Sequence, residues 1–254
     1  MIPTPCTSHV SFNTIYEPSE DSYLFLDTLS SASESAWLTT HFAHTPPPLV
    51  TEIGTGSGVV LSFAAANSAL IFGRRDILPL GIDVNRDACL ATCETARKAI
   101  CERQDDPPVS PPDSVSTRTI YMGSIMSDLG GAIRPGSVDV LLFNPPYVPT
   151  EALPGILPEG RGEGMSKFER ESYFLSLTYA GGRDGMETTE RLLGQLDGLL
   201  SERGVAYVLL CAQNRPKEVC ERICGWEGWR CELVGSSGVQ AGWEKLVIVR
   251  MWRF

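Results

Sequence analysis

The chain has 254 residues, of which 43% are hydrophobic, and its formal net charge is −10 at pH 7. This negative balance, without a visible Lys/Arg cluster, argues against direct binding of nucleic acid. No apolar run reaches the roughly 18 residues of a membrane span, and no secretory signal is recognisable, so we expect a soluble protein and no membrane partner. The length fits a single domain over residues 1–254, with an N-terminal extension and helices over 1–45 and the core over 46–254.

The chain contains eight cysteines but no C-x-x-C pair. Cys89 and Cys93 are four residues apart, as are Cys220 and Cys224, and this spacing is more typical of one helical face than of a metal site. We therefore expect free thiols, no bound metal and a reducing compartment, namely the cytoplasm with the nucleus as a second location.

The amino-terminal part predicts an extended segment followed by helices. Apolar residues recur at helical spacing from Tyr23 to Phe42, with a serine-rich interruption near 30–35, which predicts two helices or one broken helix. Pro18 suits a first helical turn, and the acidic residues after it favour a helix N-terminus. His41 and His44 precede three prolines, and we expect both in a surface loop.

Strands and helices alternate along the rest of the chain. The predicted strands are 49–53, 77–82, one within 118–126, 138–143, 204–211, 229–234 and 245–251, and the predicted helices are 59–72, 86–101, 169–179, 187–200 and 216–224. The last two strands have no helix between them, which predicts an antiparallel hairpin. The pattern indicates a Rossmann-like α/β fold, a mostly parallel seven-stranded sheet with helices on both faces. Composition predicts loops at 104–116 and at 148–169, the second as an irregular lid or substrate loop.

The stretch Asn144-Pro145-Pro146-Tyr147 is the most informative one for chemistry. Pro145 cannot donate to a sheet ladder, so Asn144 lies at the carboxyl end of a buried strand, where open parallel sheets bind ligands. Two prolines make a stiff turn with free carbonyl oxygens. The Asn144 side-chain oxygen and the Pro145 carbonyl can both accept from one planar NH2 group, whose face Tyr147 can cover. The alternative is an ordinary turn after a strand.

A glycine-rich loop, Glu52-Ile53-Gly54-Thr55-Gly56-Ser57-Gly58, follows the first predicted strand and precedes a helix. This context allows a ligand to approach the backbone closely. Asp83 ends the next strand, where its carboxylate can accept from both hydroxyls of a ribose. These features alone also fit a nicotinamide dinucleotide. The missing third glycine of that fingerprint, and the lack of a hydride-handling residue near Asn144, favour S-adenosylmethionine.

With the glycine loop, Asp83 and Asn144 to Tyr147 in this order, the chain resembles class I S-adenosylmethionine-dependent methyltransferases that act on amino or amide nitrogens. This group includes DNA adenine, RNA guanine and release-factor glutamine methyltransferases. The segment Tyr16-Glu17-Pro18-Ser19-Glu20-Asp21-Ser22 resembles the leading signature of the eukaryotic release-factor glutamine methyltransferase catalytic subunits. The similarity continues through 180–185 to 241–244, and so covers nearly the whole chain.

The resemblance implies the class I methyltransferase fold and N5-methylation of the glutamine in the Gly-Gly-Gln motif of a class I release factor. It implies that Asn144, Pro145, Pro146 and Tyr147 are catalytic. The implied cofactor-binding residues are Tyr16, Ser22, Glu52, Gly54, Gly56, Gly58, Asp83, Asp128 and Asn144. Ser124 competes with Asp128 for the adenine, because the proline-rich insertion before them leaves the register open. We expect this insertion and residues 155–164 to differ from relatives.

The resemblance also implies an obligate partner, a small zinc-binding activator protein that docks on an edge of the sheet. The third predicted strand is expected at that edge and suits strand addition. Its apolar residues are Ile120, Met122, Ile125 and Met126. The alternative is that these residues belong to the core of the sheet.

Other activities stay open. An amine also fits the acceptor clamp, so one alternative is lysine methylation of another protein such as a histone. A second is methylation of DNA adenine or RNA guanine, against which the acidic charge counts. A third is a cofactor-binding scaffold that stabilises the activator without catalysis. No general base is evident in the sequence, so we expect the proton to leave after methyl transfer.

Overall fold

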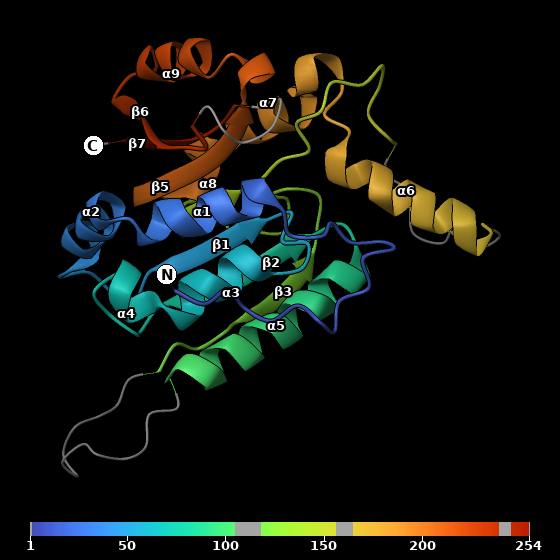
Figure 1. Cartoon of the computed structure of the whole chain (residues 1–254). Helices are drawn as coiled ribbons and strands as arrows, with labels where there is room; N and C mark the ends of the chain where they lie inside the picture. Colours follow the sequence, from blue (N-terminus) through green and yellow to red (C-terminus); the bar gives the residue numbers. More distant parts are fainter. Residues whose placement is uncertain (1, 105–117, 156–164, 239–244, 254) are drawn as a thin grey trace.

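A seven-stranded sheet forms the centre of the computed structural model, which describes residues 2–104, 118–155, 165–238 and 245–253 (Figure 1). The strands are β1 (Leu49–Ile53), β2 (Leu78–Asp83), β3 (Gly123–Met126), β4 (Val138–Phe143), β5 (Leu200–Cys211), β6 (Trp229–Ser236) and β7 (Leu246–Arg253). Their spatial order is β3-β2-β1-β4-β5-β7-β6. The first five run parallel, whereas β7 is antiparallel to both of its neighbours. The predicted class I methyltransferase fold with a C-terminal antiparallel hairpin is therefore confirmed.

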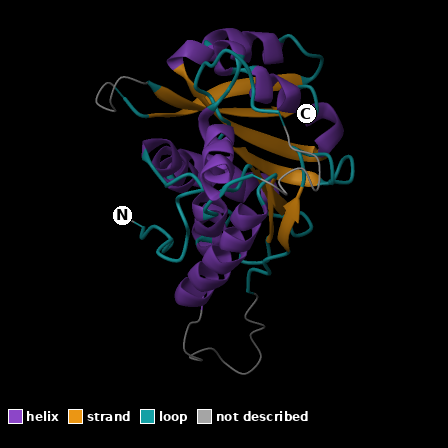
Figure 2. Cartoon of the chain, turned by 90° about the vertical axis from the view of Figure 1, so that its right-hand side faces the viewer, coloured by secondary structure: helices purple, strands orange, loops and turns teal. Residues whose placement is uncertain are grey.

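Helices cover both faces of the sheet (Figure 2). They are α1 (Glu20–Ser30), α2 (Ala32–Phe42), α3 (Val59–Ala66), α4 (Ser68–Ile71), α5 (Arg86–Gln104), α6 (Lys167–Tyr179), α7 (Glu187–Leu193), α8 (Leu196–Leu199) and α9 (Pro216–Cys224). Helices α1 to α4 contribute to one apolar core, and α7 to α9 contribute to a second core on the opposite face. Among the described helices, none is both long and apolar enough to cross a membrane.

The central strands are apolar on both faces because helices lie on each side of them. Along β5, Val205, Tyr207 and Leu209 belong to one core, whereas Ala206 and Val208 belong to the other. All six residues of β4 are buried. When helices cover both faces of a parallel sheet, its strands are continuous apolar runs in the sequence. Such a run is why β4 was predicted at its observed bounds.

Most predicted elements are present, with local differences at helix ends. The predicted helix 59–72 is broken at Asn67, whose side chain donates to the Phe63 carbonyl oxygen at 2.9 Å. The helix predicted over 187–200 is divided into α7 and α8, and β5 already begins at Leu200. Asn67 bonds to the backbone of its own helix, an alternative to continuing the helical ladder. Residues 105–117, 156–164 and 239–244 lie outside the described residues, so the predictions made for them stay predictions.

The amino-terminal segment corrects two predictions. Two separate helices are present, but Pro18 precedes the N-cap residue Ser19 and lies outside α1. His41 was predicted in a loop and instead belongs to α2, where its ring stacks on Trp37 with 4.6 Å between centroids. Its Nε2 atom lies 2.8 Å from the Arg203 carbonyl oxygen. His44 lies in an exposed turn, as predicted.

A buried charged cluster joins α2 to the C-terminal hairpin. The Arg250 guanidinium is 4% exposed and donates to both carboxylate oxygens of Glu34, at 2.8 and 2.7 Å. Tyr207 donates to the same carboxylate at 2.9 Å. The guanidinium also lies 4.1 Å from the ring centroid of Trp37 and 4.8 Å from that of Trp252. Because the pair is desolvated, removing one partner leaves a buried charge without compensation.

Arg250→Met is therefore expected to lower the free energy of unfolding by about 3–5 kcal/mol, because it leaves the buried Glu34 carboxylate without its counter-charge. The matched control is Arg222→Met, which removes the exposed ion pair between Arg222 and Glu190 and should cost about 1 kcal/mol or less. Urea titration followed by circular dichroism measures both. Equal losses for the two variants would contradict the importance of the buried pair.

Candidate functional site

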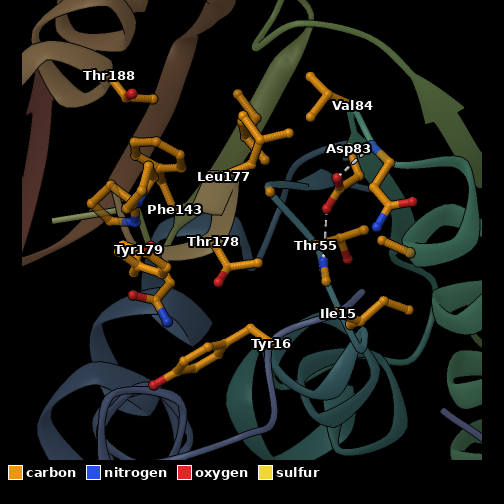
Figure 3. Close-up of a pocket in the computed structure, with 18 of the residues that line it drawn as sticks. Ile15, Tyr16, Thr55, Asp83, Val84, Phe143, Leu177, Thr178, Tyr179 and Thr188 are labelled. Atoms are coloured by element: carbon orange, nitrogen blue, oxygen red, sulfur yellow. Dashed lines mark hydrogen bonds between the residues drawn. The ribbon is translucent and has the colours of Figure 1, made fainter. Parts of the chain in front are cut away.

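A cavity opens where β1, β2 and β4 end, at the carboxyl edge of the sheet (Figure 3). Ligands bind at this edge in open parallel sheets. The structure brings nearly all the predicted site residues into its wall. Those lining it are Tyr16, Ser22, Glu52, Gly54, Gly56, Asp83, Asp128, Asn144, Pro145, Pro146 and Tyr147.

The glycine loop divides into two functional parts. Gly54 and Gly56 line the cavity with φ values of 66° and 52°, in the left-handed region that favours glycine. Gly58 does not line the cavity, in contrast to its predicted cofactor role. A Cβ at Gly58 would lie 2.7 Å from the Thr92 Cα atom, so this glycine allows α3 to pack closely on α5.

Glu52 supports the loop from below. Its side chain is 3% exposed, and Oε2 accepts hydrogen bonds from the Thr55 hydroxyl and the Leu61 backbone N–H, both at 3.0 Å. Burial raises the pKa of Glu52 to about 8, although both hydrogen bonds favour the charged form. The carboxyl group thus ties β1, the loop and α3 together at the floor of the cavity.

Asp83 is held in place by backbone donors from two elements. Its Oδ2 accepts from Gly56 N–H at 2.9 Å and its Oδ1 accepts from Asn85 N–H at 2.8 Å (Figure 3). Burial raises the pKa of this carboxyl group above its usual range. Each carboxylate oxygen can accept more than one hydrogen bond, so capacity remains for two ligand hydroxyls.

The segment after β3 lines the cavity beside Asp83, since the Ser127 backbone N–H donates to the Asp83 carbonyl oxygen at 3.0 Å. Ser127, Asp128 and Leu129 line the cavity, and the Asp128 carboxylate pairs with Arg191 of α7. Ser124 does not line it, because its hydroxyl hydrogen bonds with that of Tyr121 at 2.6 Å. The position of Asp128 therefore suits the predicted adenine contact better than that of Ser124.

The Asn144 side chain makes different contacts at its two ends. Its Nδ2 donates to Asp21 Oδ2 at 3.1 Å. Its Oδ1 is buried and has no hydrogen-bond partner. A buried acceptor without a partner is costly, and this oxygen keeps its full capacity to accept from a ligand donor.

The turn after Asn144 is held by close backbone packing. A Cβ at Gly185 would lie 1.9 Å from the Tyr147 carbonyl oxygen, and one at Gly181 would lie 2.6 Å from the Pro146 carbonyl oxygen. Asn214 donates from Nδ2 to the carbonyl oxygen of Asp184 at 3.0 Å and lies near that of Tyr147. Gly181 and Gly185 are therefore required because their backbone supports the Pro-Pro turn.

Some of the cavity wall was not predicted from sequence. Asp21, Ile15, Phe174 and Leu177 also line the cavity, the last two from α6. Asp21 lies within the leading signature, so its position was available as a signal. The α6 residues carry no such signal, because only the tertiary fold brings them over the edge of the sheet.

The described residues contain no group of three or more His, Cys, Asp or Glu placed to hold a metal ion. None of the eight cysteines, all of which lie in the described residues, forms a disulfide bond. Cys89 is buried, whereas Cys224 is exposed, so the two predicted cysteine pairs are not equally part of the core.

Glu52→Gln should change how stability depends on pH. A raised folded-state pKa means that the folded protein binds this proton more tightly than the unfolded chain, so the wild type loses stability as pH rises from 4.5 toward about 8. The slope for one such group is at most about 1.4 kcal/mol per pH unit. Urea unfolding across this range should show a flatter curve for Glu52→Gln, and an unchanged curve for the exposed control Glu227→Gln. Parallel curves for wild type and Glu52→Gln would refute the assignment.

No family model matches the chain. It is 31% identical over 257 residues to the eRF1 methyltransferase catalytic subunit mtq2 of Schizosaccharomyces pombe, covering 100% of this chain and 96% of that protein. It is 33% identical to the methyltransferase HEMK2 of Mus musculus, covering 98% and 96% of the two chains. A putative protein N5-glutamine methyltransferase of Methanocaldococcus jannaschii is 26% identical, with 94% and 92% covered. Full-length similarity at this level shows that the chain belongs to the family that contains the eRF1 methyltransferase catalytic subunit mtq2 and the methyltransferase HEMK2.

Proposed function

We propose that this chain methylates the side-chain nitrogen of the glutamine in the Gly-Gly-Gln motif of a class I translation release factor, forming N5-methylglutamine. The observation that carries the proposal is the buried, unpartnered Asn144 Oδ1 at the end of β4, next to the Pro145 backbone. The relatives named for eRF1 and for N5-glutamine methylation support the choice of acceptor.

The cavity residues fit S-adenosylmethionine as the methyl donor. When bound, this cofactor supplies an electrophilic methyl group on a sulfonium. Gly54 and Gly56 leave the loop backbone open to a ligand, since a Cβ at either would meet no atom closer than 3.9 Å. Asp83 retains acceptor capacity for ribose hydroxyls, and Asp128 lines the same cavity after the neighbouring strand β3, where it can contact the adenine.

The acceptor clamp addresses the weak nucleophilicity of an amide nitrogen, whose lone pair is delocalised into its carbonyl. Asn144 Oδ1 and the Pro145 carbonyl oxygen accept hydrogen bonds from the two N–H groups of the substrate amide. These two hydrogen bonds orient the nitrogen and favour its pyramidal form. Such positioning can supply on the order of 7–11 kcal/mol in well-oriented systems. The acceptor N–H becomes acidic once the nitrogen carries the methyl group, so the proton leaves after transfer.

The free edge of the sheet supports a heterodimer with a small zinc-binding activator protein. Strand β3 lies at the edge of the described sheet. Ile120, Met122 and Met126 are 64%, 55% and 53% exposed, so these three are not core residues. Exposed apolar residues on an edge strand are a liability for aggregation, which a partner strand removes. The cytoplasm is the proposed compartment, consistent with eight cysteines that form no disulfide bond.

Asn144→Ala is expected to reduce methylation at least about 100-fold with little change in cofactor affinity, because it removes a contact to the acceptor. The assay combines the chain, the activator, labelled S-adenosylmethionine and a release factor, and a Gln→Asn release factor serves as the acceptor control. Unchanged activity would reject the role of Asn144, and equal labelling of the control would reject glutamine as the acceptor. Labelling of a lysine instead would favour the alternative acceptor.

Met122→Asp should prevent the activator from binding, because it places a charge on the apolar edge of β3. Co-expression followed by size-exclusion chromatography measures the fraction of heterodimer. The matched control is Leu233→Asp on β6, where Leu233 is also exposed but lies at the opposite end of the strand order. If Met122→Asp forms as much heterodimer as the control variant does, β3 is excluded as the docking edge.

A further inference from the structure

The Asn144 amide has to be oriented as well as placed. Its oxygen and its NH2 group occupy nearly the same volume, so rotation by about 180° exchanges an acceptor for a donor without changing the shape of the residue. Packing alone therefore cannot decide which end faces the cavity. The contact that does distinguish the two ends is the hydrogen bond from Nδ2 to Asp21, 123 positions away in sequence.

Asp21 is itself held rigidly. It lies in the first turn of α1 and is 4% exposed. Its Oδ1 accepts from the Ser22 backbone N–H at 2.6 Å and from the Ser22 hydroxyl at 3.3 Å, which leaves Oδ2 for Asn144. The N-terminus of a helix favours a negative charge at this position. A carboxylate only accepts hydrogen bonds, so it pairs with the NH2 end of Asn144 and not with the oxygen.

We infer that Asp21 is a positioning residue that holds Asn144 with its oxygen toward the acceptor nitrogen and its NH2 group away from it. This inference rests on the proposed function. In the rotated amide, two NH2 groups would face each other and the clamp would lose one of its two acceptors. The charged partner also polarises the amide and strengthens Oδ1 as an acceptor while positive charge develops on the methylated nitrogen.

Asp21→Asn tests the inference, because Asn at this position can donate as well as accept and no longer selects one orientation of Asn144. We expect kcat to fall roughly 10- to 100-fold, as for loss of a hydrogen bond to a charged group. The dissociation constant of S-adenosylmethionine should change less than about twofold, since the acceptor side of the site is affected. The matched control is Asp27→Asn, an exposed residue of the same helix, which should retain wild-type kcat.

A double-mutant cycle separates positioning through Asn144 from an independent effect. In the Asn144→Ala background, Asp21→Asn should cost little further activity, because the group that Asp21 orients is gone. Full activity of the single variant, or the same fold-loss in both backgrounds, would overturn the inference.

A second measurement needs no acceptor and no Asp21 variant. In wild-type protein labelled with 15N at asparagine, the side-chain NH2 signals of Asn144 are assigned by their absence from Asn144→Ala. We expect slow hydrogen exchange for these protons, and fast exchange in wild type would overturn the inference. If these protons exchange slowly but the wild-type protein does not methylate a release factor, the proposed acceptor is rejected. The orientation of Asn144 by Asp21 is then still supported.

Discussion

The parallel register of three neighbouring strands is the constraint on which the site depends. Ile53 of β1 lies opposite Ile82 of β2 and Phe143 of β4. The residues that follow on β1 and β4, together with Asp83 at the end of β2, therefore emerge at one level of the same sheet edge. The glycine loop, the Asp83 carboxylate and the acceptor amide meet because the sheet aligns them, although nearly a hundred residues separate the first from the last.

Rigidity at this edge comes from backbone packing more than from side chains. The Pro-Pro turn has fixed φ angles, and Gly181 and Gly185 let a second stretch of backbone lie directly against its carbonyl groups. Any side chain at these two positions would displace the turn. The Glu52 carboxyl group likewise fixes the glycine loop, because it accepts hydrogen bonds from the loop and from the first turn of α3. The chain thereby presents ligand-binding groups whose positions are set before a ligand arrives.

The two edge strands of the sheet, β3 and β6, lie in different surroundings. At one end the edge strand β6 pairs with β7 in a hairpin, which the Arg250 cluster fastens to α2. At the other end, β3 is short, and the exposed Met126 in it and Met122 just before it flank an edge that can accept another strand. The net charge of −10 is consistent with protein partners at such surfaces and disfavours contacts with a phosphate backbone.

Local sequence patterns were sufficient to predict much of the fold and of the candidate site. Apolar runs, glycine spacing and the Asn-Pro-Pro-Tyr turn predicted the strands, their carboxyl ends and most of the cavity wall, because these signals arise from backbone geometry within a few residues. Only the tertiary structure decided the roles of Gly58, His41 and Asp21. Gly58 packs against α5, His41 contacts the carbonyl oxygen of Arg203, and Asp21 accepts a hydrogen bond from the Asn144 amide. Such contacts join segments distant in sequence, and no local pattern encodes the partner.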